Sequence, residues 1–201
     1  MEGNAEKPGN AFPHLMNGNR KGSSFEREIC KKLSLWWSNE VEGSPRDDIF
    51  WRASQSGGRA TQRAKSGKRT AGSYGDIAAM DPVGAPLLKV FTLELKRGRS
   101  HGDLGDMLDL PLKGYKQRPF EKTLEQARRS HELANSQSWL LISQRDRRRC
   151  LVIGDWFFLN SCIEGRIPCV PLLKGEVVTY FPFSIFLRKL TPSKIIALTK
   201  L

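Results

Sequence analysis

The sequence contains no run of the roughly 18 to 20 apolar residues that a membrane-crossing helix needs. Its first 22 residues, MEGNAEKPGNAFPHLMNGNRKG, are polar and glycine-rich and lack the apolar core of a secretory signal. We therefore expect a flexible N-terminal arm over residues 1–22, no membrane partner and a cytoplasmic location.

Cysteine and histidine are scarce, and their spacing matches no metal-binding pattern. The cysteines and histidines stand far apart, at Cys30, Cys150, Cys162, Cys169, His14, His101 and His131. Without a CxxC, HxH or HxxxH pair, the sequence predicts neither a zinc knuckle, a disulfide framework nor a histidine-based metal site, and reduced thiols are expected. A GxxxxGK[ST] phosphate loop is also missing, so we expect no nucleotide cofactor.

Acidic residues are outnumbered. The 33 Lys and Arg residues face 21 Asp and Glu residues, which leaves a formal charge of +12. A surplus of this size favours polyanionic partners such as nucleic acid. The 201 residues, 39% of them hydrophobic, suffice for one compact core. We expect a single domain over residues 23–201, with a core over about 23–153 and a C-terminal extension over about 154–201.

The apolar periodicity predicts helices and strands in alternation. Residues 73–98, SYGDIAAMDPVGAPLLKVFTLELKRG, read as two strands around a proline–glycine turn. Helices are expected at 22–41 and 121–136, strands at 47–54, 138–143 and 149–159, and a strand with a short helix at 176–190. This order predicts an α/β (mixed α+β) domain with a central mixed sheet flanked by helices.

Between the first strand and the hairpin lies a basic segment without large apolar residues or acids. Residues 55–73 read QSGGRATQRAKSGKRTAGS. Loops this long are uncommon in compact domains unless they are functional, and the charge of this one favours contact with phosphates. The residues expected to bind nucleic acid here and beside it are Arg52, Ser54, Ser56, Arg59, Arg63, Lys65, Lys68, Arg69 and Arg97.

Within the hairpin, three charged side chains stand among apolar residues. Side chains alternate along a strand, so Glu94 and Lys96 share one face. A turn centred on residues 83–84 pairs Asp76 near Thr92 and makes Glu94 its diagonal neighbour. Two carboxylates this close repel each other unless a cation lies between them, and Mg²⁺ takes one or two carboxylates together with waters and phosphate oxygens. The face therefore predicts a metal-assisted active site, in which Lys96 orients water or stabilises negative charge at phosphorus.

These residues resemble the signature of the PD-(D/E)XK nuclease superfamily, with Asp76 followed by ELK at residues 94–96. The stretch KGSSFEREICKKL, residues 21–33, is similar to the opening helix of archaeal-type Holliday junction resolvases and related phage nucleases. Those proteins carry a glutamate where Glu26 stands, and a serine-rich basic loop before the metal aspartate, as here. Gly75 occupies the position of the name-giving proline.

The resemblance covers about residues 21–142 and implies a restriction-endonuclease-like core with Mg²⁺-dependent phosphodiester hydrolysis, in which Mn²⁺ can substitute. It implies that Glu26, Asp76 and Glu94 hold the metal, directly or through water, and that Lys96 is the catalytic lysine. Glu28 is a rival to Glu26, and helix periodicity does not decide between them. Gln126 is expected to be a surface residue.

The expected function is a structure-selective DNA endonuclease of recombination or repair, in a bacterial, archaeal or phage-infected cell. A junction resolvase must cut two strands symmetrically, so a homodimer with two active sites is expected. Two alternatives stay open. One is a restriction-like or repair nuclease with the same core, and the other is a basic DNA-binding protein without catalysis.

Overall fold

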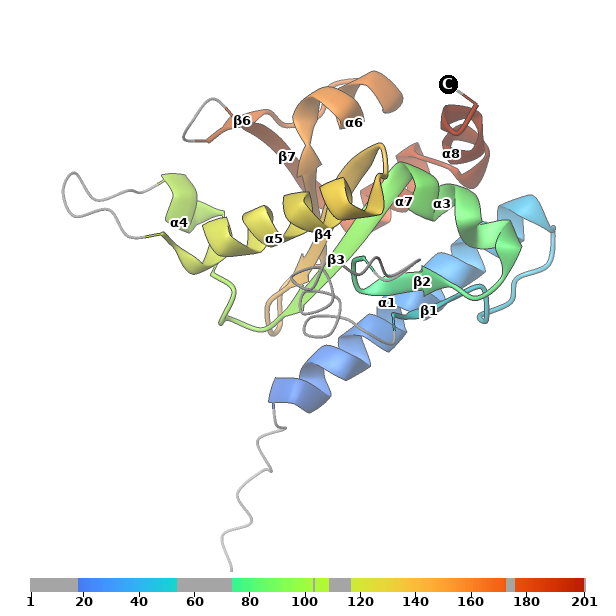
Figure 1. Cartoon of the computed structure of the whole chain (residues 1–201), viewed down its shortest axis with the longest axis horizontal. Coiled ribbons are helices and arrows are strands. Elements are labelled where there is room, and N and C mark those ends of the chain that lie inside the picture. Colours follow the sequence, from blue (N-terminus) through green and yellow to red (C-terminus); the bar gives the residue numbers. More distant parts are fainter. Residues whose placement is uncertain (1–17, 54–73, 103, 109–116, 173–175, 201) are drawn as a thin grey trace, which may run out of the picture.

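The structure is a computed structural model that describes residues 18–53, 74–102, 104–108, 117–172 and 176–200 (Figure 1). In chain order its helices and strands are α1 (Gly18–Val41), β1 (Phe50–Arg52), β2 (Ile77–Ala79), the 3₁₀ helix η1 (Pro82–Gly84), α3 (Ala85–Val90), β3 (Phe91–Arg97), α4 (Gly105–Leu108), α5 (Pro119–Ala134), β4 (Ser138–Gln144), β5 (Leu151–Asp155), α6 (Trp156–Cys162), β6 (Val170–Pro171), β7 (Val177–Pro182), α7 (Phe183–Lys189) and α8 (Pro192–Leu198). None of these described helices has the length and apolar character that would let it span a membrane.

Five strands form one mixed sheet in the order β3-β4-β5-β7-β6. β3 and β4 run parallel, and α5 makes the crossover between them. The other neighbouring strands are antiparallel. α5 crosses β3 and β4 on one face, while α1 packs against β3 from the other (Figure 1). The predicted mixed α/β fold is confirmed, and it is consistent with a restriction-endonuclease-like core.

The alternation of side chains along β3 and β4 divides the core into two layers. Leu93 and Leu95 join α1 residues such as Phe25 in one buried cluster. Leu141 of β4 joins Leu124 of α5 in the other. Glu94 lies opposite Leu141 in the parallel register. The side chain of Glu94 therefore faces α5 rather than α1.

A short antiparallel ribbon of β1 and β2 lies beside the main sheet. Its register pairs Trp51 with Ala78 and Arg52 with Ile77. The ribbon is tied to α1, because the N–H of Phe50 donates to the hydroxyl of Ser34 at 2.9 Å. The ribbon places Asp76, the residue before β2, next to β3.

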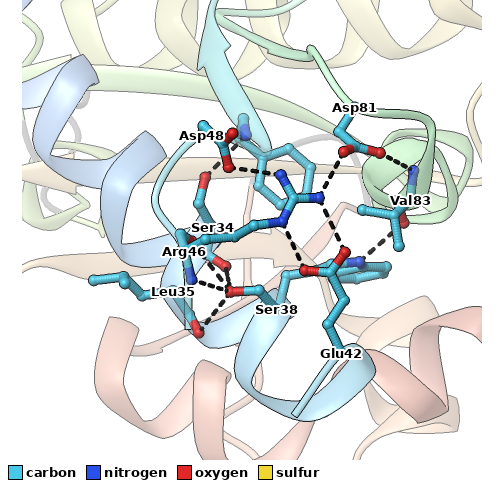
Figure 2. Close-up of polar contacts among 10 residues, drawn as sticks. Ser34, Leu35, Ser38, Glu42, Arg46, Asp48, Asp81 and Val83 are labelled. Carbon is cyan, nitrogen blue, oxygen red and sulfur yellow. Dashed lines mark hydrogen bonds and ion pairs between the residues drawn. The ribbon is translucent and has the colours of Figure 1, made fainter. Parts of the chain in front are cut away.

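Arg46 fixes the ribbon relative to α1 and η1 (Figure 2). Its guanidinium makes ion pairs with Glu42 at 2.7 Å, Asp48 at 2.6 Å and Asp81 at 2.5 Å. The backbone N–H of Arg46 donates to the hydroxyl of Ser38 at 2.8 Å. One cation thus links the end of α1, the entry to β1 and the start of η1.

The prediction of a simple hairpin before Glu94 was wrong in its middle. The expected turn is replaced by η1 and α3, and the second strand begins only at Phe91. Asp81 caps η1 by accepting a backbone N–H at 2.9 Å. Pro82 and Pro86 stand at the first positions of η1 and α3, where the fixed φ of proline favours a helix.

The predicted strand over 149–159 was wrong in its second half. β5 ends at Asp155, whose carboxylate accepts the N–H of Phe158 at 2.7 Å and starts α6. The aromatic residues that suggested a strand are therefore helical. The predicted helices at 22–41 and 121–136, and the strand at 138–143, are confirmed.

Candidate active site

Glu94 is a buried carboxylate in the middle of β3, with 2% of its surface exposed. One carboxylate oxygen accepts from Gln126 Nε2 at 2.9 Å, and the other accepts from Ser130 Oγ at 2.7 Å. Gln126 and Ser130 are four residues apart on α5 and so lie on the same helix face. Two neutral donors from one helix face therefore orient the Glu94 carboxylate.

Asp76 reaches Glu94 because Gly75 lets the backbone press against β3. Gly75 has a φ of +83°, and a Cβ there would lie 2.8 Å from the carbonyl oxygen of Leu93. The N–H of Asp76 donates to that same carbonyl at 2.8 Å. The N–H of Leu95 in turn donates to Asp76 Oδ2 at 2.8 Å. These bonds flank Glu94 on β3 and hold the two carboxylates side by side. Proline, restricted to negative φ, could not adopt the Gly75 conformation.

The electrostatics of this pair are unfavourable for two ionised carboxylates. The pKa of Asp76 is raised from 3.8 to about 7, chiefly by burial and next by the neighbouring charge of Glu94. The Lys96 ammonium and the N–H of Leu95 act in the opposite direction. Burial outweighs these stabilising contacts because water is excluded from a side chain that is only 7% exposed.

Lys96 lies on the same face of β3, two residues after Glu94. Its ammonium nitrogen is 3.6 Å from a Glu94 carboxylate oxygen, and 24% of its side chain is exposed. The ion pair is longer than a hydrogen bond. The ammonium therefore retains donors that can reach a substrate anion at the mouth of the site.

The donor set fits a hard divalent cation. Asp76 and Glu94 offer carboxylate oxygens, the ligands that Mg²⁺ prefers, and a cation between them would relieve the repulsion that contributes to the raised Asp76 pKa. Across the described part of the chain, no three His, Cys, Asp or Glu side chains are grouped closely enough to hold a metal. The other ligand positions would therefore belong to waters and phosphate oxygens, as is usual for Mg²⁺.

Glu26 approaches this region from α1, but its carboxylate is bound by a cation of the protein. Arg52 donates through Nε to Glu26 Oε2. The pKa of the Cys30 thiol is raised to about 12, chiefly by burial; the charges of Glu26 and Asp76 also raise it, and Arg52 lowers it. The charges of Glu26, Arg52 and Asp76 therefore all act on one buried thiol. Any ligand role for Glu26 requires it to share its carboxylate with Arg52 or to act through water.

Glu28, the rival to Glu26, lies on a different face of α1. Its carboxylate pairs with Lys32 at 2.7 Å, and about half of each side chain is exposed, 48% and 50% respectively. The pair has the i, i+4 spacing of a solvated helix surface. The geometry therefore favours Glu26 as the α1 residue nearest the site.

Two of the predicted DNA-binding residues, Arg52 and Arg97, are described. Arg52 pairs with Glu26, as above. Arg97 donates to Gln144, lies 3.5 Å from Asp146, and holds its guanidinium 5.6 Å from the centre of the Phe25 ring. The other predicted residues lie outside the described part of the chain, namely Ser54, Ser56, Arg59, Arg63, Lys65, Lys68 and Arg69.

The sequence reasoning missed the two α5 residues that hold Glu94. Gln126 was predicted to be a surface residue, and its residue surface is indeed exposed, yet its amide reaches the buried carboxylate. Ser130 was not singled out. The signal that could have found them is the i, i+4 pair of neutral polar residues that borders the buried face of the helix, on which Thr123 and Ala127 lie.

A family model described as "Phage putative PDDEXK endonuclease" matches residues 17–161. The match covers most of the chain and includes α1, the acidic pair, Lys96 and α5. No significant match was found among curated proteins or among solved structures.

Proposed function

The chain belongs to this family of phage PDDEXK endonucleases, and on that premise we propose that it is a divalent-metal-dependent DNA endonuclease selective for branched DNA. The family itself makes the protein a nuclease, with DNA as its substrate. Metal-dependent cleavage is proposed because Asp76 and Lys96 both lie beside Glu94 of β3.

Asp76 and Glu94 are the proposed protein ligands of Mg²⁺, with Mn²⁺ as a substitute and Glu26 contributing through water. When bound, such an ion supplies Lewis-acid polarisation of a phosphate oxygen and a hydroxide-like nucleophile. Gln126 and Ser130 keep Glu94 in the orientation that this requires. The ammonium of Lys96 stabilises the negative charge that increases at the scissile phosphate.

The basic residues supply binding rather than chemistry. Arg52, Arg97 and the basic residues of the 54–69 segment are the proposed phosphate contacts. Lys and Arg contacts of this kind release counterions, so binding should weaken steeply as salt rises.

The proposed selectivity for branched DNA rests on the basic character of the chain. It is supported by the basic segment that precedes Asp76 and by the charge of +12. Resolution of a four-way junction requires two symmetric cuts, so this proposal includes a two-fold symmetric dimer with one active site in each subunit. Sedimentation of the free protein tests the dimer separately from activity.

The test is cleavage of a labelled four-way junction and of its matched linear duplex, in Mg²⁺ and in EDTA. Wild type is compared with Glu94→Ala and with Glu28→Ala, a matched acid removal on the exposed face of α1. The proposal expects paired symmetric cuts in the junction, lost in EDTA and in Glu94→Ala but kept in Glu28→Ala.

Other outcomes correct the proposal in defined ways. Equal cutting of junction and duplex would keep the nuclease and remove the preference for branches. Tight binding without cutting, in Mn²⁺ as well and on flap and single-stranded substrates, would favour the non-catalytic DNA-binding protein.

A further inference from the structure

Trp51 is the one tryptophan of the described residues that is exposed, with 51% of its surface accessible. The other tryptophans are buried or half-buried. Met80, at 66%, is also exposed. An exposed large aromatic side chain forgoes the free energy that burial would give it, so its position calls for an explanation.

The register of the ribbon places Trp51 on the same face as Asp76. Trp51 lies opposite Ala78, and the ladder continues with the N–H of Ala53 donating to the carbonyl of Asp76 at 2.9 Å. Residues opposite each other in an antiparallel pair point to the same face, as do residues two apart on one strand. Trp51, Ala53, Asp76, Ala78 and Met80 therefore share one face, while Arg52 points to the other, toward α1.

Trp51 is also the diagonal neighbour of Asp76 across the ribbon. Such neighbours have backbones about 7 to 8 Å apart, within reach of an aromatic side chain. A nucleotide whose phosphate lies at Asp76 and Glu94 would thus have its own or the adjacent base near the indole ring. Met80, one rung further on the same face, extends the apolar surface beneath it.

We propose that Trp51 stacks on an unpaired base of the DNA substrate beside the scissile phosphate. This inference rests on the proposed nuclease function and names the feature of the substrate that the enzyme reads. A base inside an intact duplex is already stacked on both sides, so only a gap, a flap or an opened junction offers it to Trp51. Stacking on an aromatic ring tolerates any base, because every base has a π-face. Trp51 thus selects for DNA structure and not for sequence.

The experiment measures equilibrium binding in EDTA, which prevents cutting, to a fluorescently labelled duplex and to the same duplex with a single-stranded gap. The variants are Trp51→Ala, Trp51→Phe and Phe157→Ala. Phe157 is an even more exposed aromatic, at 63%, on α6, which lies well away from the ribbon in Figure 1. A 2-aminopurine base in the gap reports stacking through the quenching of its fluorescence.

Trp51→Ala should weaken binding to gapped DNA by roughly 5- to 150-fold, the range for loss of one base–aromatic stack. It should change binding to the intact duplex by less than about twofold. Quenching of 2-aminopurine should be lost in Trp51→Ala and largely retained in Trp51→Phe. Phe157→Ala should behave as wild type in every measurement.

Equal weakening on both DNAs, or unchanged binding to both, overturns the inference. A Trp51→Ala protein that binds gapped DNA normally but sediments as a smaller species would assign Trp51 to contact between subunits instead.

Failure of the stacking role can be distinguished from failure of the nuclease proposal. A wild type that cuts DNA with no dependence on Trp51 refutes only the stacking role. Trp51-dependent binding without any cutting refutes only the nuclease proposal. A wild type that binds no DNA refutes both.

Discussion

Replacing Asp76 by asparagine isolates the cost of burying an ionised carboxylate beside Glu94. Asparagine has the shape of a protonated aspartate, and its carbonyl oxygen can still accept the hydrogen bond from the N–H of Leu95. Its amide group can donate to Glu94. The substitution therefore removes the negative charge with little change in packing.

The magnitude follows from the pKa of Asp76, which rises from 3.8 to about 7 on folding. The folded protein holds this proton more tightly than the unfolded chain, so between these pH values the free energy of unfolding falls as pH rises. Each pH unit is worth about 1.4 kcal/mol, which gives a ceiling of about 4 kcal/mol above pH 7. Movement of Lys96 toward the Asp76 carboxylate would make the actual cost smaller than this ceiling. We expect the free energy of unfolding of Asp76→Asn to exceed that of wild type by at least about 1 kcal/mol above pH 7.

The assay is thermal unfolding in EDTA at a series of pH values from 4 to 8. Asp76→Asn and wild type should unfold together near pH 4, and the variant should gain in stability until the difference levels off above pH 7. For a chain of this size each kcal/mol moves the midpoint by roughly 2 to 4 °C. Asp47→Asn is the matched control, because Asp47 is 54% exposed and pairs with a surface lysine at 3.1 Å. Its effect should stay within about 1 kcal/mol and show no such pH dependence.

Addition of Mg²⁺ should reverse the order, because an ion bound between two carboxylates stabilises wild type and not the variant. A stability difference that is the same at pH 4 and pH 8 would refute the reasoning, since it would show that the Asp76 charge is not what the substitution removes. A variant less stable than wild type at pH 8 without metal would refute it more strongly, since the carboxylate would then stabilise the fold.

Three further predictions concern the residues that position the site. Gly75→Ala should lower the free energy of unfolding in urea by about 2 to 4 kcal/mol, because positive φ and the contact with β3 both oppose a Cβ. Gly98→Ala isolates the backbone strain, since Gly98 has a φ of +101° but open space around it, and should lower this free energy by about 1 kcal/mol. Equal losses in the two variants would argue against the close approach of Gly75 to β3. Gln126→Ala should raise the Mg²⁺ concentration needed for half-maximal cleavage by about 10- to 100-fold and lower the free energy of unfolding by about 1 to 3 kcal/mol, because the buried Glu94 carboxylate loses a donor. An unchanged Mg²⁺ requirement would show that Gln126 does not orient the carboxylate. Arg46→Met should lower the unfolding midpoint, and the loss should shrink in high salt because it arises from ion pairs; a loss that does not depend on salt would point to packing instead.

The part of the site that could be predicted from sequence is the part governed by local alternation. Glu94 and Lys96 share a face because strand side chains alternate, and this holds wherever the strand begins. The contact of Asp76 with Glu94 was also predicted, although for the wrong reason. The expected turn does not exist, and the two meet because Gly75 allows close backbone approach to β3.

What the sequence did not reveal depends on longer-range structure or on competing local signals. Gln126 and Ser130 contact Glu94 only because α5 crosses back over β3 before β4 begins, and their spacing alone fits an exposed helix face equally well. At Asp155, strand-forming aromatic residues follow an aspartate that caps a helix, and there the capping hydrogen bond outweighed strand propensity. At Asp81, a proline and a glycine that suggested a turn follow an aspartate that caps a 3₁₀ helix instead.

The Arg46 cluster has a consequence for how DNA can approach the ribbon. Three carboxylates surround one guanidinium, so this corner carries two surplus negative charges in a protein of net charge +12. It lies where β1 begins and β2 ends, whereas Asp76 and the ladder to Ala53 lie at the opposite end of the ribbon. Within a Debye length of roughly 8 Å, the cluster repels phosphates. In the proposed binding mode, this negative corner would repel the phosphates of a nucleic-acid strand and favour a path along the ribbon toward Asp76 and Glu94.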